Sequence, residues 1–202
     1  TLLAALLLPA IRDAAGRARA ARCQVNERQI GVGVIGYVQD NEGMMPPRDP
    51  TNWVVAGVAT AYPKFSDMIA PYLQLKSAFN TVWICPADKR KLNNSYGLNV
   101  NSVPSEYGID RPYPYSGVVR RSQVVLLADA ATWGSGSDRE IFWFKDALVN
   151  VNVEFRHPRS RANESTPPTT GELAQATAQV LFYDGHVEAR AFGSLSSTNY
   201  YP

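Results

Sequence analysis

The 202-residue chain has only two cysteines and two histidines. Two cysteines cannot supply a four-thiolate zinc site or a disulfide-dense scaffold, and two histidines exclude a histidine-rich metal centre. The sequence also has no Gly-rich phosphate-binding loop, no nucleophile elbow and no Cys-x-x-Cys motif. These absences indicate that the protein is not an enzyme and holds no cofactor.

The chain has little surplus of charge of either sign, since 20 Lys and Arg against 18 Asp and Glu leave a net charge of +2. Nucleic-acid-binding domains usually concentrate basic charge on one face, so we expect no nucleic-acid partner. Hydrophobic residues make up 45% of the chain and charged residues 19%, which is enough to form a buried core.

The sequence also lacks a hydrophobic run long enough to span a bilayer, which takes about 20 residues. Its first eleven residues are nearly all apolar, which is unusual for an exposed end of a soluble domain. They fit a signal-peptide remnant, the second half of a longer membrane helix, or a helix buried in an assembly. The helical pattern continues beyond Pro9, which favours the last two explanations.

One long helix is predicted from about residue 2 to about residue 40. Small or apolar residues recur at helical spacing along one face: they are Ile11, Ala14, Ala18, Ala21, Val25, Val32 and Ile35. Charged residues, Glu27 among them, fall largely on other faces. Pro9 predicts either a simple kink or a melted segment that lets subunits stack. At ~1.5 Å per residue the helix is roughly 60 Å long, so its apolar end projects beyond the domain.

The rest of the chain predicts loops followed by strands. Residues 44–118 are rich in turn residues, with a short helix at Phe65–Leu73, a short strand at Thr81–Cys85 and mostly turns over 93–115. Period-two patterns then predict strands at 124–128, 140–144, 149–155, 179–183 and 186–190, the last two joined by an Asp184-Gly185 hairpin turn.

The predicted fold class is therefore α+β, with a long N-terminal helix packed on an antiparallel sheet. We divide the chain into an apolar and amphipathic helix at 1–43 and a β-rich head at 44–202. The polar stretch 158–178 is predicted to be an exposed insertion in that head.

The order of several short motifs resembles a known family. After the Leu/Ala segment and Pro9 come "CQVNERQIG", "ICPAD", "SYGLN", "VVLLADA" and "LFYDGHVE". The chain is similar to the type IV pilin-like proteins, G-like pseudopilins of type II secretion, of the planctomycete type. Their C-terminal signature is a His, about nine residues, and then Asp-Gly.

Two features depart from that pattern. The family's prepilin cleavage site and Phe-Thr-Leu-Ile-Glu start are missing, so we expect roughly thirteen mature residues upstream of this sequence. Between His157 and Asp184 lie 26 residues (158 to 183) instead of nine, which identifies the Ser/Thr/Pro-rich stretch as an insertion in the signature.

The resemblance implies a structural subunit of a type IV pilus-like extracellular filament, inserted in the inner membrane before assembly. Its partners are then copies of itself and the inner-membrane assembly machinery. The N-terminal helix packs in the fibre core through an assembly segment: Leu2, Leu3, Leu6, Leu7, Leu8, Pro9 and Ile11. The alternatives are a minor pseudopilin of a type II secretion system and a carbohydrate-binding or adhesive surface module.

Cys23 and Cys85 either form one disulfide or remain two separate buried thiols. Export across a membrane favours the disulfide, provided that the helix packs on the sheet near its middle.

Two further features are candidate sites. His157, Asp184 and His186 combine imidazole and carboxylate ligands, and G-type pseudopilins are known for a Ca²⁺ site, with Asp129 and Asp138 as weaker candidates. The competing explanation is a hairpin turn with histidines bonded to the backbone. The insertion also resembles an O-glycosylated stretch, with candidate sites at Ser165, Thr166, Thr169 and Thr170.

Overall fold

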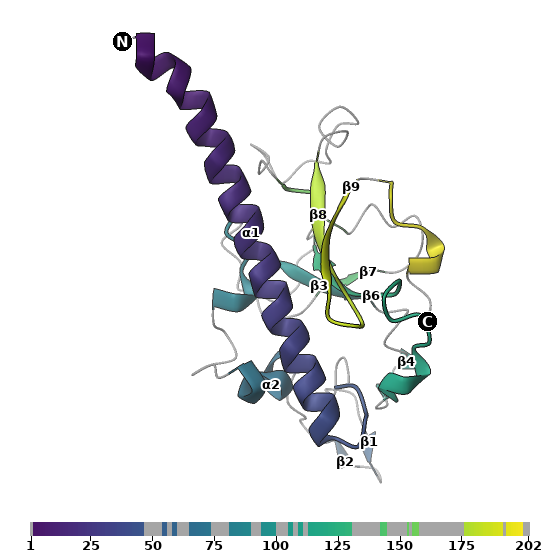
Figure 1. Cartoon of the computed structure of the whole chain (residues 1–202). Helices are drawn as coiled ribbons and strands as arrows, with labels where there is room; N and C mark the ends of the chain where they lie inside the picture. Colours follow the sequence, from purple (N-terminus) through teal and green to yellow (C-terminus); the bar gives the residue numbers. More distant parts are fainter. Residues whose placement is uncertain are drawn as a thin grey trace.

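A computed structural model of the chain shows one long helix lying along one face of a twisted β-sheet (Figure 1). The structure describes residues 2–46, 54–55, 58–59, 65–73, 81–89, 94–99, 105–106, 109–110, 113–130, 142–144, 153, 155–157, 176–191 and 193–199. The α+β class and the long N-terminal helix packed on an antiparallel sheet are confirmed.

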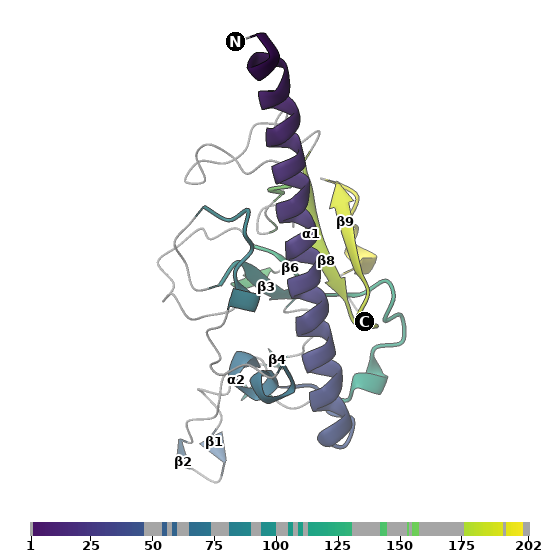
Figure 2. The same ribbon diagram turned by 60° about the vertical axis from the view of Figure 1, so that its left-hand side comes forward.

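Helix α1 spans Leu2–Asp40, as the sequence predicts, and it continues through Pro9. Its N-terminal third projects beyond the sheet, and the rest crosses β8 and β9 (Figures 1 and 2). Beyond Asp40 the backbone turns left-handed at Glu42 and Gly43, and the Gly43 amide donates to the Val38 carbonyl at 2.9 Å. This backbone hydrogen bond satisfies one of the terminal carbonyls and ends the helix.

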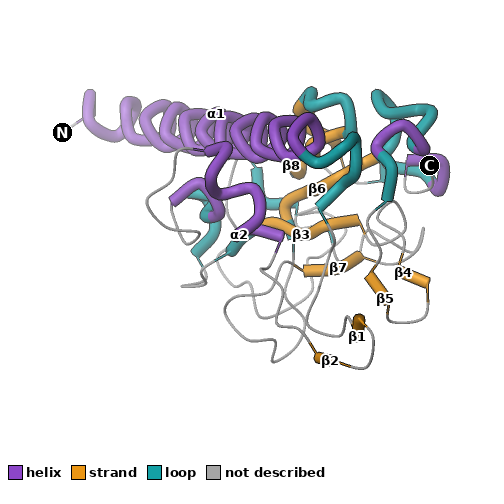
Figure 3. The backbone as a smooth tube through the Cα atoms, turned by 90° about the horizontal axis from the view of Figure 1, so that it is seen from below, coloured by secondary structure: helices purple, strands orange, loops and turns teal. Residues whose placement is uncertain are grey.

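The main sheet has the strand order β7-β3-β6-β8-β9. Its strands are β3 (Tyr96–Asn99), β6 (Val125–Asp129), β7 (Phe142–Phe144), β8 (Thr177–Phe182) and β9 (Val187–Ala191). The four strands from β3 to β9 pair antiparallel, whereas the edge strand β7 pairs parallel with β3. Viewed from below, α1 forms one layer and the sheet the next (Figure 3).

Alternate residues of the sheet face two different cores, as the pleat of a strand requires. Leu98, Leu127 and Leu181 join the core beneath α1. Val180 and Phe182 join Phe155 in a second cluster on the other face. The central strands therefore bury both faces.

The β8–β9 hairpin confirms the Asp-Gly turn. Gly185 has a φ of +89°, a backbone conformation that is unfavourable for residues with a Cβ. Its amide donates a hydrogen bond to the Phe182 carbonyl at 3.0 Å. The last two residues of the predicted insertion, Thr177 and Ala178, begin β8, and Ala178 is fully buried. Ala176 before them is partly buried, and the remainder of the stretch, 158–175, lies outside the described residues.

Two predictions of local structure are wrong. Thr81–Trp83 is a 3₁₀ turn (η3), not part of a strand, because this segment turns to place Trp83 and Cys85 in the core beneath α1. Tyr96–Asn99, expected among turns, is the buried strand β3. Its pairing with β6 and β7 on its two sides overrides the turn preference of its Gly and Asn residues.

A second helical segment, α2 (Phe65–Ile69) followed by the 3₁₀ turn η2 (Ala70–Leu73), confirms the short helix predicted there. It packs against α1 where two glycines leave room. A Cβ on Gly33 would lie 2.8 Å from Leu73 Cδ2, and one on Gly36 would lie 2.8 Å from Tyr72 Cδ1. These glycines therefore permit close packing of the two segments, rather than merely weakening the helix.

The remaining elements are short. Two-residue strands pair as β1 (Val54–Val55) with β2 (Val58–Ala59) and as β4 (Ser105–Glu106) with β5 (Ile109–Asp110). The 3₁₀ turns η4 (Tyr115–Gly117) and η6 (Ser197–Asn199) complete the described chain. Of the predicted strand at 149–155, Val153 pairs with Ala130 and Phe155 is buried. No helix among the described residues combines the length and the apolar character needed to cross a bilayer.

Candidate functional site

Helix α1 presents two opposite faces, and both carry candidate functional residues. Its inner face lies against the sheet and consists of Cys23, Glu27, Ile30, Val34 and Val38, all buried. Its outer face lies on the opposite side and consists of Leu7, Ile11, Ala14, Ala18, Ala21, Val25 and Val32, all exposed. At 100° per residue the two sets point in nearly opposite directions.

The outer face is the apolar pattern that the sequence shows most clearly. From Leu7 to Val32 these residues follow one another at alternating spacings of four and three, and Arg28 occupies the one position of this series that is not apolar. The average spacing is the 3.5-residue period of coiled-coil contacts. Ile11 is 60% exposed, Val25 48% and Val32 65%. Within the described chain nothing covers these side chains, so the periodic face does not pack on the sheet.

The assembly segment shares Leu7 and Ile11 with this outer face. Leu7 and Leu8 are 56% and 53% exposed, and Pro9 lies exposed within α1. Leu2, Leu3 and Leu6 also fall within α1, and the description of side chains begins at Leu7. The projecting part of the helix therefore carries large apolar side chains away from the sheet.

On the inner face, Cys23 and Cys85 form the disulfide that the sequence favours, with a Cα–Cα distance of 5.1 Å. Both residues are fully buried. The bond closes a loop of 62 residues and links α1 to the segment that follows η3. In the chain-entropy account, a loop of this length contributes about 4 kcal/mol to stability.

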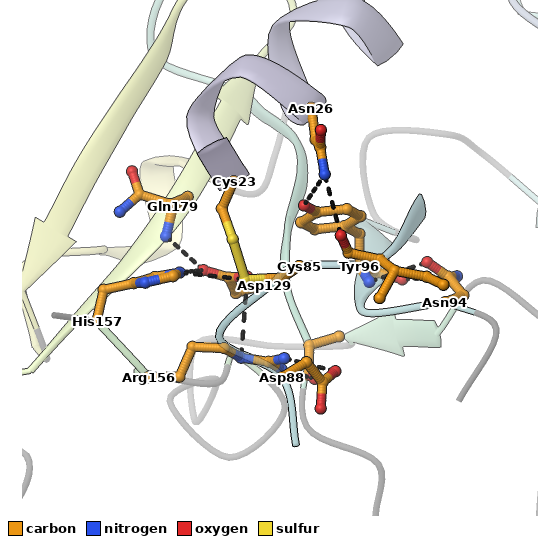
Figure 4. Close-up of polar contacts among 12 residues, drawn as sticks. Cys23, Asn26, Cys85, Asp88, Asn94, Tyr96, Asp129, Arg156, His157 and Gln179 are labelled. Atoms are coloured by element: carbon orange, nitrogen blue, oxygen red, sulfur yellow. Dashed lines mark hydrogen bonds and ion pairs between the residues drawn. A yellow bond between two sulfur atoms is a disulfide. The ribbon is translucent and has the colours of Figure 1, made fainter. Parts of the chain in front are cut away.

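A buried polar network surrounds this disulfide (Figure 4). Asp129 lies at the end of β6, and its Oδ2 accepts a hydrogen bond from the backbone amide of Gln179 at 2.8 Å. The same Oδ2 lies 3.1 Å from His157 Nε2. The same His157 nitrogen lies 3.5 Å from Cys85 Sγ. On the other side, Asn26 donates to the Ile84 carbonyl at 3.0 Å, which fixes the backbone next to Cys85.

Arg156 supplies the positive charge of this network. It is fully buried, pairs with Asp88 at 2.5 Å and donates to the Ala130 carbonyl at 2.6 Å. Its Nε also lies 3.9 Å from Asp129 Oδ1. Arg156 thus lies between two carboxylates and offsets part of their charge.

Glu27 is the unexpected member of the inner face, because the sequence places it among solvated charges. It is fully buried, and neither carboxyl oxygen has a hydrogen-bond partner within the described chain. Desolvation raises the pKa of Glu27 well above its ordinary value, and the nearby Asp129 raises this pKa further, whereas Arg156 lowers it. Burial thus favours the protonated form of this carboxyl group.

The proposed grouping of His157, Asp184 and His186 is wrong. His157 joins Asp129 and the two cysteines in one group of ligand atoms. Asp184 and His186 instead form an exposed pair on the hairpin, where Asp184 Oδ1 lies 2.5 Å from His186 Nδ1 and accepts the His186 amide at 3.1 Å. Local turn chemistry accounts for this pair, in line with the competing explanation.

Asp129 does not fit the expected Ca²⁺ site either. Its neighbours are an imidazole nitrogen, sulfur atoms and a guanidinium group, whereas Ca²⁺ requires oxygen ligands. Asp138 lies outside the described residues, as do the proposed glycosylation sites: Ser165, Thr166, Thr169 and Thr170.

Sequence reasoning missed the buried acid Glu27 and several members of the network: Asn26, Asp88, Arg156 and Gln179. Glu27 carries a readable signal, since it follows Cys23 by four residues and must share its helix face. Arg156 carries none, because its partners come from distant segments. Comparisons of the chain with family models, with curated proteins and with solved structures find no match.

Proposed function

We propose that the protein is a structural subunit of a type IV pilus-like extracellular filament, held in the inner membrane before it is assembled. The observation that carries the proposal is the exposed outer face of α1. The helix-on-sheet architecture is compatible with a pilin-like fold, and the proposed role needs no catalytic group.

The occupant of the outer face is α1 of another copy of the chain. Its 3.5-residue period matches helices that pack side by side at a small angle. The three alanines in its middle let two helix axes approach closely, while the larger side chains lie toward its ends. Fully burying one such large side chain contributes ~1.5–3 kcal/mol, and several are available on each copy.

Charge along the helix favours a shift between neighbouring copies. Arg22 and Asp40 are 18 residues, or five turns, apart and therefore lie on the same side of α1. Helices in register would place two Arg22 side chains at one level. A shift of ~27 Å instead brings Arg22 of one copy level with Asp40 of the next. A shifted contact between unlike surfaces repeats without closing, and an open filament results.

A minor pseudopilin of a type II secretion system would use the same helix face and differ in forming no long fibre. A carbohydrate-binding module would use exposed aromatic side chains, whereas the large apolar side chains exposed in the described chain are all aliphatic. Among the described aromatic residues, Trp83, Tyr96 and Tyr183 are buried, and Tyr72, Tyr113 and Tyr115 are half-buried. We therefore prefer the filament subunit.

Electron microscopy of the native cell surface and of the purified full-length chain tests this function. We expect fibres that contain the protein, and we expect Val25→Asp or Val32→Asp to abolish them. Val119→Asp is the matched control, because Val119 is 85% exposed and lies off α1.

Filaments that persist in both helix variants would show that the outer face is not the contact. A chain that stays monomeric without detergent, with α1 intact, would remove the proposal altogether. Detection only at the base of secretion complexes would favour the minor pseudopilin.

A further inference from the structure

The disulfide lies among side chains that bind transition metals. The ligand atoms of four buried residues all lie within 4.8 Å of one another. These residues, here called the sulfur cluster, are Cys23, Cys85, Asp129 and His157. Figure 4 shows the carboxylate and the imidazole pointing toward the sulfur atoms from different segments of the chain.

We propose that the sulfur cluster binds one divalent ion of the zinc class when its two cysteines are reduced. Two thiolates, one imidazole and one carboxylate are ligands that Zn²⁺ takes in a tetrahedral site. With metal–ligand bonds of about 2.0–2.3 Å, tetrahedral ligand atoms lie about 3.3–3.8 Å apart.

Two of the required separations are already close to those values. Cys85 Sγ and His157 Nε2 are 3.5 Å apart, and His157 Nε2 and Asp129 Oδ2 are 3.1 Å apart. The sulfur atoms must separate once their bond is broken, and the cysteine Cα atoms, 5.1 Å apart, leave room for this.

Asp129 has an oxygen available for the ion. Its Oδ2 already accepts the Gln179 amide. Its Oδ1 is buried and accepts no hydrogen bond within the described chain. The Gln179 backbone amide thus holds Oδ2, the oxygen 3.1 Å from His157 Nε2, in place as the ligand, while Oδ1 stays toward Arg156. Support of this kind orders ligands in metal sites.

A neighbouring cation offsets part of the charge. Two thiolates, one carboxylate and a divalent ion sum to −1, and the buried Arg156 guanidinium, which also pairs with Asp88, lies beside Asp129. An uncompensated buried charge would be costly, so this neighbour favours the loaded site.

The two states of the cluster interconvert by ordinary thiol chemistry. A dithiol reductant breaks the Cys23–Cys85 bond, becoming a cyclic disulfide itself while each cysteine gains a proton and an electron. Metal binding then displaces both thiol protons to solvent. The proposal is independent of filament formation.

Cobalt(II) is the probe for the test, because tetrahedral thiolate coordination gives it strong visible absorption. The full-length chain is reduced in denaturant, refolded in mild detergent and titrated with Co²⁺, which Zn²⁺ then displaces. We expect one Co²⁺ per reduced chain and none per oxidised chain. Absence of tetrahedral bands in the reduced chain, or equal binding by both forms, would overturn the proposal.

Variants identify the ligands. Asp129→Asn and His157→Gln should each weaken Co²⁺ binding by more than ~10–100-fold, the loss that is typical when a residue that only supports a metal ligand is removed. The control is Asp184→Asn with His186→Gln, a carboxylate–imidazole pair outside the cluster, and we expect no change. Full affinity in both cluster variants would overturn the four-ligand site.

A second readout covers a variant that fails to refold when reduced. In the wild-type chain, Zn²⁺ should slow alkylation of Cys23 and Cys85 at least tenfold, as followed by mass spectrometry. Unchanged alkylation in the presence of Zn²⁺ would contradict the proposal even if every cluster variant proved unstable.

Discussion

The inner and outer faces of α1 share a helix but differ in what covers them. Ile30 and Val34 are buried against the head, whereas Val25 and Val32 are exposed in the single chain. The inner face also holds a disulfide and a buried acid. Its side chains pack into the core, whereas the described part of the head leaves the outer face exposed.

This difference shows that apolar periodicity alone does not identify a core. The most regular apolar pattern in the sequence lies on the outer face, and the less regular inner face contacts the sheet. In α1 the described sheet covers one apolar side of the helix, and the other apolar side is exposed.

The strongest test of this difference introduces a carboxylate on each face of α1 in separate variants. Ile30→Asp places an unpaired carboxylate in the core and should cost more than about 4 kcal/mol, enough to unfold the chain. Val32→Asp, two residues away, should change the free energy of unfolding by less than about 0.5 kcal/mol. Urea unfolding followed by circular dichroism measures both, and equal losses would show that the faces are not distinct.

The next largest effect concerns the bond that anchors the inner face. Replacing both cysteines, as in Cys23→Ala with Cys85→Ala, should lower the free energy of unfolding by about 4 kcal/mol. The reduced wild-type chain, compared by the same urea titration, controls for the altered side chains. A loss below ~1 kcal/mol would mean that the remaining inner-face contacts hold α1 without the bond.

Glu27 should make the free energy of unfolding depend on pH. Because burial raises its pKa above the ordinary value of 4.5, the folded state retains this proton to higher pH than the unfolded state does. Its contribution to stability is thus complete below about pH 4.5 and is lost as pH rises toward the folded pKa, by ~1.4 kcal/mol per pH unit.

Glu27→Gln should therefore match the wild type at pH 4 and exceed its stability increasingly above that pH. Urea titrations at several pH values measure the difference, with Glu188→Gln on the exposed surface of β9 as control. A constant difference between wild type and Glu27→Gln across the range would contradict a titrating buried acid.

The smallest effect belongs to the hairpin turn beside α1. Gly185→Ala forces a Cβ into a left-handed conformation and places it 3.2 Å from Ile35 Cδ1. We expect a loss of about 1–2 kcal/mol in the free energy of unfolding, measured by thermal or urea unfolding. Gly193→Ala isolates the conformational part, since its added Cβ meets nothing within 4 Å.

Local patterns made the helix, the β8–β9 hairpin and β6 predictable. The run from Leu2 to Asp40 ends at strong stop residues, and Asp184-Gly185 separates two strand patterns. Strand β3 was not predictable, because Tyr96–Asn99 has turn-forming residues and becomes a strand only through its neighbours.

The candidate site follows the same division. The cysteine pair was predictable because the chain has no other cysteine. Grouping His157 with Asp129 was not, since these residues are far apart in the sequence and meet only when β6 and β8 pair. Their neighbours in the sequence gave no hint of this contact.

The position of the disulfide has a mechanical consequence. Cys23 lies in the middle of α1, beyond the projecting third, and comes before Ile30 and Val34 on the buried inner face. Tension applied to that projecting end passes through a covalent link before it loads the apolar contacts at Ile30 and Val34. Force on the projecting end therefore cannot separate α1 from the head by breaking side-chain contacts alone, because the disulfide must also break.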